Sequence, residues 1–176
     1  MADSPRAEDA PDSETERLRR LEVLLARRGL PMRRLATGRG HVPEELASAS
    51  RDQRSLVAHA KGFPWAGPDG CAAWVEGVFQ WFGLGLERGD ARALYERHCT
   101  LADPGDLRVG MIVAVPRCPA SPQAARHGHV GIYVGDGMVM DSADHGVRTV
   151  PLALWYGAYG AWEQPRWGWM RGVALA

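Results

Sequence analysis

The chain has 176 residues, of which 45% are hydrophobic and seven are tryptophan. That length and composition suffice for one sizeable core, so we expect one domain preceded by an extra N-terminal segment. The 21 basic residues balance the 21 acidic ones. A chain without net charge has no overall positive field to attract nucleic acid or an anionic membrane, which argues against both as partners.

The N-terminal region is expected to have a tail and a helical extension. Residues 1–13 are rich in Asp, Glu, Pro and Ala and lack apolar periodicity, which predicts disorder. Residues 14–60 are expected to form the extension, with leucines at helical spacing over residues 14–28 and a weaker helix over residues 43–59. No apolar run is long enough for a signal peptide or a membrane span, so we expect neither.

Three cysteines occur in the chain without a close CxxC pair: Cys71, Cys99 and Cys118. An odd number at this spacing argues against a disulfide framework and against a four-cysteine zinc site. A bridge between Cys99 and Cys118 would leave Cys71 free, and the sequence leaves that pairing open.

Residues 61–176 are expected to form the main domain, and its best supported element is a helix that begins at Cys71. Apolar residues recur there at helical spacing: Cys71, Trp74, Val75, Val78, Phe79 and Phe82. A glycine-rich turn precedes this helix. In that turn we expect Asp69 to cap the helix and Gly70 to let the backbone approach a substrate closely.

The sequence pattern in the rest of the main domain predicts an α+β fold. A short helix is expected over residues 91–98, a polar connection over 119–126, and strands over 110–115, 129–134, 138–141 and 147–150. The aromatic residues near the C-terminus are expected to cover the sheet rather than to contact a glycan.

Cys71 and His129 have the residue types and the contexts of a cysteine nucleophile and its base. The positive end of a helix dipole favours the thiolate form of a cysteine at a helix start, and a neighbouring imidazolium favours it as well. Backbone N–H groups around Cys71 would stabilise an oxyanion. The alternative interpretation of Cys71 is a buried structural cysteine. His127 is a substitute base if the strand begins elsewhere.

Asp141 is the candidate third residue, and its position depends on strand register. A three-residue loop at residues 135–137 would place its carboxylate diagonally beside His129, where it would orient the imidazole. A two-residue turn would reverse the parity and point Asp141 away. The three-residue loop implies the pairs Val134–Met138 and Gly131–Asp141. Weaker candidates for the third residue are Asp144 and His145.

Three segments in this order carry a resemblance to a known family: GPDGCAAWV around Cys71, DLRVGMIVAV from residue 106, and GHVGIYVGDG around His129. Over about residues 63–170 the chain resembles the papain-like superfamily of NlpC-type and CHAP cell-wall peptidases and amidases. The resemblance implies a cysteine-bearing helix packed on an antiparallel sheet that carries the histidine. It implies Cys71 as nucleophile, His129 as base and Asp141 as third residue. Around the nucleophile the family usually has Asp-Cys-Ser-Gly, where this chain has Gly-Cys-Ala-Ala.

The resemblance also implies a function. We expect a cysteine peptidase or amidase, of the endopeptidase or N-acetylmuramoyl-L-alanine amidase type. It would cleave an amide bond in peptidoglycan stem peptides, or at the glycan–peptide junction, through an acyl-enzyme at Cys71. The expected partner is a peptidoglycan or muropeptide substrate, and no cofactor or metal is expected.

Two alternatives to this function remain. The first is an inactive module of the same fold that binds a wall peptide or a protein partner. The second, less favoured, is a metal site formed by Cys71, His129 and Asp141. Because no export signal is seen, we expect a protein that is cytoplasmic as synthesised and that acts at the cell wall after lysis or non-standard export.

Overall fold

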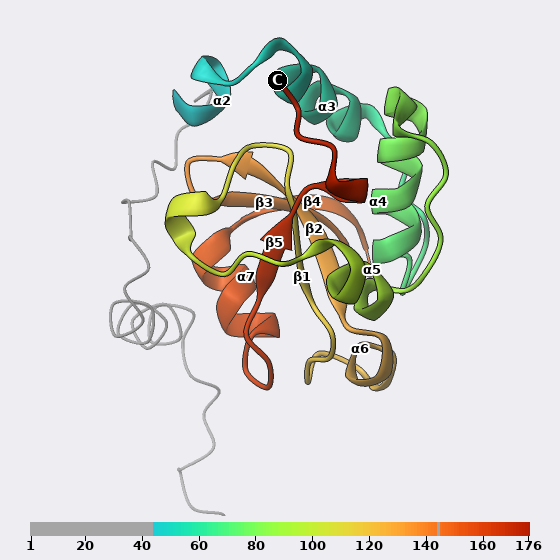
Figure 1. Ribbon diagram of the computed structural model, residues 1–176. Helices are drawn as coiled ribbons and strands as arrows, with labels where there is room; N and C mark the ends of the chain where they lie inside the picture. Colours follow the sequence, from blue (N-terminus) through green and yellow to red (C-terminus); the bar gives the residue numbers. More distant parts are fainter. Residues whose placement is uncertain (1–43, 144) are drawn as a thin grey trace, which may run out of the picture.

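A computed structural model describes residues 44–143 and 145–176 of the chain. The predicted tail and the predicted helix over residues 14–28 lie outside the described residues, as does Asp144. Figure 1 shows helices arranged around one curved sheet. The helices are α2 (Glu44–Ser48), α3 (Arg51–Gly62), α4 (Cys71–Phe79), α5 (Ala91–His98), α6 (Pro122–His127) and α7 (Leu152–Tyr159), and the strands are β1 (Ile112–Val115), β2 (His129–Gly135), β3 (Met138–Ala143), β4 (Gly146–Pro151) and β5 (Arg166–Gly168).

The five strands form one antiparallel sheet in the order β4-β3-β2-β1-β5. Three of them, β2, β3 and β4, follow one another in the chain and pair in sequence, so short turns suffice to connect them. Strands β1 and β2 are buried along their whole length, as expected for the centre of a sheet covered on both sides. The predicted α+β class is confirmed, and all four predicted strands are present.

Helix α4 packs on the sheet because one of its sides is apolar. Its predicted stripe is buried from Cys71 to Phe79, and Phe82, in the π-helical turn Gln80–Leu84 that follows, packs partly buried against the core. Figure 1 shows the sheet between α4 on one side and α7 on the other. Helix α4 therefore presents its first residue, Cys71, at the border between these layers.

The N-terminal part of the described chain differs from the prediction. One helix was expected over residues 43–59, but Ser50 divides it into α2 and α3. The Ser50 side chain accepts from the Gln53 N–H, and the Gln53 side chain accepts from the Ser50 N–H, which is a capping box that starts a new helix. Helix α3 extends past residue 60, and its buried side chains belong to the same core as the sheet.

The segment between β1 and β2 also differs from the prediction. A polar connection was expected over residues 119–126, but Pro122–His127 forms the short helix α6. Ser121 caps it by accepting from the Ala124 N–H, and Pro122 occupies the first turn, where its missing N–H costs nothing.

The hairpin between β2 and β3 combines a shorter turn with a bulge. Gly135 pairs with Met138 across the two-residue turn Asp136-Gly137, so the predicted three-residue loop and the predicted Val134–Met138 pair are wrong. The register shifts between Tyr133 and Gly135 and leaves one extra residue on β2. This bulge restores the parity that a two-residue turn alone would reverse. The predicted pairing of Gly131 with Asp141 is therefore confirmed.

Candidate active site

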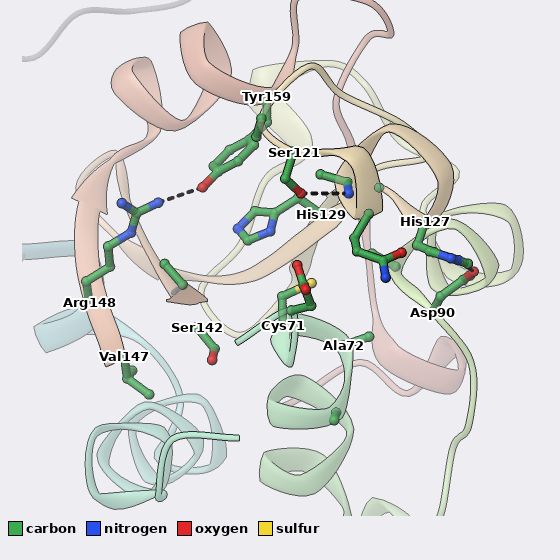
Figure 2. A pocket seen from close by; sticks show the side chains of 18 of the residues that line it. Cys71, Ala72, Asp90, Ser121, His127, His129, Ser142, Val147, Arg148 and Tyr159 are labelled. Atoms are coloured by element: carbon green, nitrogen blue, oxygen red, sulfur yellow. Dashed lines mark hydrogen bonds and ion pairs between the residues drawn. The ribbon is translucent and has the colours of Figure 1, made fainter. Parts of the chain in front are cut away.

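A cavity of about 780 Å³ lies where the start of α4 meets the ends of β2, β3 and β4. Figure 2 shows Cys71 and His129 facing each other in this cavity, with the Tyr159 ring next to the imidazole and the Arg148 side chain pointing to the Tyr159 hydroxyl. Its volume falls within the range of about 300–1,000 Å³ typical of small-molecule sites. Six of the residues that line it are alanines: Ala72, Ala73, Ala91, Ala120, Ala124 and Ala143.

Cys71 is the first residue of α4, and 9% of it is exposed, on the cavity side. No side chain caps this helix. The N–H groups of the first helical turn have no intrahelical acceptor, so they remain able to bind an acceptor in the cavity. The positive end of the helix dipole points the same way. Helix α4 thus combines a thiol with unsatisfied donors and a positive potential.

Two predictions for the turn before Cys71 are wrong. Asp69 was expected to cap α4, but it adopts a left-handed conformation with φ of 56° and makes no cap bond. Gly70 was expected to make room for a substrate. Instead it makes room for the chain itself, because a Cβ atom there would lie 2.7 Å from the Ala66 carbonyl oxygen. Asp69 still lines the cavity as an exposed carboxylate.

His129 and Asp141 form a buried pair on one face of the sheet. The Nε2 atom of His129 lies 2.7 Å from Oδ2 of Asp141, and the Asp141 side chain is fully buried. Because Nε2 is engaged with Asp141, Nδ1 is the ring nitrogen left for a second partner. Gly131, two residues after His129 on β2, lies directly opposite Asp141 in the ladder, and the space beside it is filled by Val139, Met140 and Asp141. Gly131 does not line the cavity.

Two residues that sequence reasoning left out complete the site. Arg148 on β4 lies opposite Asp141 in the ladder, and its Nε donates to Oδ1 at 2.8 Å. Its Nη2 donates to Oδ2 of Asp141 at 3.3 Å and to the hydroxyl oxygen of Tyr159 at 2.7 Å. The Tyr159 ring stacks on the His129 ring, with centroids 4.0 Å apart and planes inclined by 23°. Trp155 packs beside both rings, with its centroid 5.8 Å from that of His129 and 5.0 Å from that of Tyr159.

The charges of this site are coupled. Burial opposes a charge on His129, but the bond to Asp141 and the nearby Cys71 sulfur outweigh it and raise the pKa of the imidazole to about 9. Burial also opposes a charge on Asp141, yet hydrogen bonds with His129 and Arg148 keep the pKa of its carboxyl below the usual value. Near neutral pH, two cations therefore flank one carboxylate. The remaining positive charge favours an anion in the cavity, such as a thiolate or an oxyanion.

The other candidate residues are arranged differently. His127, the substitute base, is exposed at the end of α6, and its Nδ1 lies 2.7 Å from Oδ2 of Asp90 on the cavity rim. His145 is exposed on the opposite rim. Cys99 and Cys118 are buried free cysteines, so the bridge between them that the sequence left open is not formed.

A metal site finds no support in this arrangement. In the part of the chain that the structure describes, no group of three or more His, Cys, Asp and Glu side chains could hold a metal ion. Both carboxylate oxygens of Asp141 are occupied by protein donors, His129 and Arg148.

Signals for the two overlooked residues were present in the sequence. Strands were expected over residues 138–141 and 147–150, and pairing these two strands around a tight turn would have placed Arg148 opposite Asp141. Trp155 and Tyr159 are four residues apart, which places them on one side of a helix. Their position against His129 depends on how α7 packs on the sheet, which no local pattern specifies.

Comparisons with known proteins do not assign the chain to a family. No protein-family model matches the chain, and a search of curated proteins finds no match. Among the described helices, none combines the length and the apolar character needed to cross a membrane. The case for a function therefore depends on the geometry of the cavity and on the resemblance noted above.

Proposed function

We propose that this protein is a cysteine hydrolase with a papain-like fold that cleaves an amide bond of peptidoglycan. In this proposal Cys71 is the nucleophile, His129 the base and Asp141 the residue that orients the imidazole. The observation that carries it is the convergence of a helix-start cysteine and a buried His129–Asp141 pair on one cavity. A nucleophile, a base and an orienting group within reach of one another are the requirement for covalent acyl transfer.

The reaction would proceed in two stages. The Cys71 thiolate attacks the amide carbonyl carbon, and a C–S bond forms while the oxygen becomes an oxyanion. The unsatisfied N–H groups at the start of α4 are the nearest donors for that oxyanion. His129 then donates its Nδ1 proton to the amide nitrogen, the C–N bond breaks and the amine leaves.

The second stage regenerates the enzyme. Neutral His129 accepts a proton from water at Nδ1, and the resulting hydroxide attacks the thioester carbon. The C–S bond breaks, the carboxylic acid leaves, and the Cys71 thiolate and the imidazolium are restored. Throughout both stages Asp141 bonds Nε2 and keeps Nδ1 turned towards the reacting atoms.

Two features support a wall peptide as the substrate. The resemblance to NlpC-type and CHAP enzymes implies it, and the six alanines in the cavity lining leave space for the side chains of a bound peptide. Trp155 and Tyr159 of α7, in contrast, are buried beside His129, where they support the imidazole rather than a glycan. The proposal is therefore centred on the peptide part of the wall.

The test is digestion of purified muropeptides and intact peptidoglycan by wild type, Cys71→Ala and His129→Ala. We expect new fragments from wild type alone, and their masses identify the bond that is cleaved. Circular dichroism establishes that both variants are folded. Absence of cleavage by folded wild type on wall material of several chemistries would refute the proposal and favour the inactive binding module. Equal cleavage by Cys71→Ala would refute the role of Cys71.

A further inference from the structure

Four side chains from four different elements form a closed circuit around the imidazole. Asp141 bonds His129 and Arg148, Arg148 bonds the Tyr159 hydroxyl, and the Tyr159 ring stacks back on His129. Strands β2, β3 and β4 and helix α7 each contribute one member. A circuit of this kind limits the rotation of every member, because each side chain is held at two points.

We infer that Arg148 and Tyr159 are positioning residues of the proposed reaction, which hold Asp141 and His129 with Nδ1 directed at Cys71. This inference rests on the function proposed above. Neither residue would touch the reacting atoms. Arg148 acts through the Asp141 carboxylate, and Tyr159 acts through the face of the imidazole.

The geometry assigns a separate task to each of them. The Nε of Arg148 occupies Oδ1 of Asp141 at 2.8 Å, so the carboxylate cannot turn without losing this bond, and Oδ2 stays at 2.7 Å from His129. The Tyr159 ring covers the imidazole at a centroid distance of 4.0 Å and restricts its tilt. Displacement of a catalytic group by about 1 Å can cost roughly a hundredfold in rate, so such constraints matter for turnover.

Arg148 also has a distinctive electrostatic consequence. It shares the Asp141 carboxylate with His129, so it weakens the attraction between that carboxylate and the imidazolium. Removal of the guanidinium charge should therefore let His129 keep its proton to higher pH. The other groups that face His129 are Cys71 from α4 and the ring of Tyr159 from α7, whose hydroxyl bonds Arg148. Cys118 lies near Cys71 and Tyr159, and burial raises the pKa of its thiol.

The test compares Arg148→Gln with Arg117→Gln as a matched control. Arg117 is an exposed arginine that pairs with Glu163 outside the cavity. We expect Arg148→Gln to lower kcat roughly 10- to 100-fold, and to move the alkaline limb of kcat/KM up by roughly half to one pH unit. The control should match wild type in both respects. If the alkaline limb of the Arg148→Gln profile coincided with that of wild type, the positioning role of Arg148 would be overturned.

Two further variants separate charge from geometry and cover a failure of Arg148→Gln to fold. Arg148→Lys keeps the positive charge but loses the pair of hydrogen bonds that two guanidinium nitrogens donate to Asp141. We therefore expect kcat to fall while the alkaline limb of the kcat/KM profile stays at the same pH. Tyr159→Phe keeps the stack and should retain most of the activity, whereas Tyr159→Leu should lower kcat. Wild-type kcat in both Arg148→Lys and Tyr159→Leu would overturn the inference.

A substrate-free readout distinguishes this inference from the proposed function. The titration of the His129 imidazole can be followed by NMR in protein labelled at histidine. If no wall fragment is cleaved but Arg148→Gln still raises the His129 pKa, the positioning role stands and the substrate assignment fails. If fragments are cleaved but the His129 titration is the same in both proteins, the positioning role fails and the hydrolase assignment stands.

Discussion

Gly131 lies directly opposite Asp141 in the β2–β3 ladder, and its missing side chain allows the two strands to hold the His129–Asp141 pair. A Cβ atom at Gly131 would lie 2.7 Å from Cγ1 of Val139, 2.8 Å from the carbonyl oxygen of Met140 and 3.2 Å from Cβ of Asp141. The first two distances are too short for any real contact. The close packing of the strands around the Asp141 carboxylate therefore requires glycine at position 131.

Substitution of this glycine should therefore damage the site. We expect Gly131→Ala to lower the free energy of unfolding by about 1–3 kcal/mol through overpacking, and to lower kcat because Asp141 must shift. Urea unfolding and steady-state kinetics measure the two effects. Gly62→Ala is the matched control, since a Cβ atom there meets nothing within 4 Å. If Gly131→Ala behaved like Gly62→Ala, the close packing around Asp141 would be incorrect.

The charge of Asp141 is predicted to be essential for turnover. Asp141→Asn keeps the size of the side chain but removes the anion that stabilises the imidazolium, so we expect kcat/KM to fall by roughly 10²- to 10⁴-fold. The pKa of His129, raised to about 9 in the wild type, should fall in the variant.

The control for this change is Asp103→Asn. Asp103 caps a short 3₁₀ helix, and asparagine caps equally well, so its activity should match wild type. Asp141→Asn with wild-type activity would remove Asp141 from the proposed mechanism, whatever its effect on stability.

The three cysteines should differ in accessibility. Cys99 is buried, and burial raises its pKa to about 12, while burial also raises the pKa of Cys118. Cys71 alone lines the large cavity. We expect iodoacetamide to modify one cysteine in the folded protein and three after unfolding in urea, as counted by mass spectrometry. Peptide mapping should place the first label on Cys71, and rapid labelling of Cys99 or Cys118 in folded protein would contradict this arrangement.

The pH dependence of the stability of the folded protein follows from the His129–Asp141 pair. The folded pKa of His129, about 9, lies above its unfolded value of 6.5. Its contribution to stability is therefore fully present below pH 6.5 and is lost as the pH rises through 9, and it amounts to roughly 3 kcal/mol. The pKa of Asp141 is lowered in the folded protein. Its contribution to stability is therefore present at pH values above the ordinary pKa of the carboxyl group, and it is lost as the pH falls through the lower pKa of the folded protein.

Urea unfolding of wild type and His129→Gln between pH 5 and pH 10 measures this contribution. The difference in the free energy of unfolding should be largest at the acidic end of this range and should shrink as the pH passes 9. A difference that stayed constant from pH 5 to pH 10 would show that the folded and unfolded proteins bind this proton equally well.

The elements of the site could be predicted from sequence where the pattern is local. The stripe that begins at Cys71 has helical spacing, and the strand at His129 is a continuous apolar run, so both were predicted correctly. The Ser50–Gln53 capping box and the Ser121-Pro122 pair are equally local signals for the starts of α3 and α6. The capping box was overlooked because it lies inside the segment that was predicted as one continuous helix, and the Ser121-Pro122 signal because α6 has only six residues.

The environment of the imidazole could be predicted only in part. The Gly131–Asp141 pairing followed from an incorrect loop length, and it holds because the bulge on β2 compensates for the shorter turn. Turn length and bulges depend on backbone conformations that residue identities specify weakly. The roles of Arg148 and Tyr159 depend on contacts between separate elements, which are set by the packing of the whole domain.

The most direct test of the account is the intact mass of the protein after rapid acid quenching during turnover of a muropeptide. We predict a covalent adduct whose mass equals the acyl part of the substrate, attached to Cys71 by a thioester and absent from Cys71→Ala. Turnover without any adduct on Cys71, together with full activity of Cys71→Ala, would contradict covalent catalysis at this site.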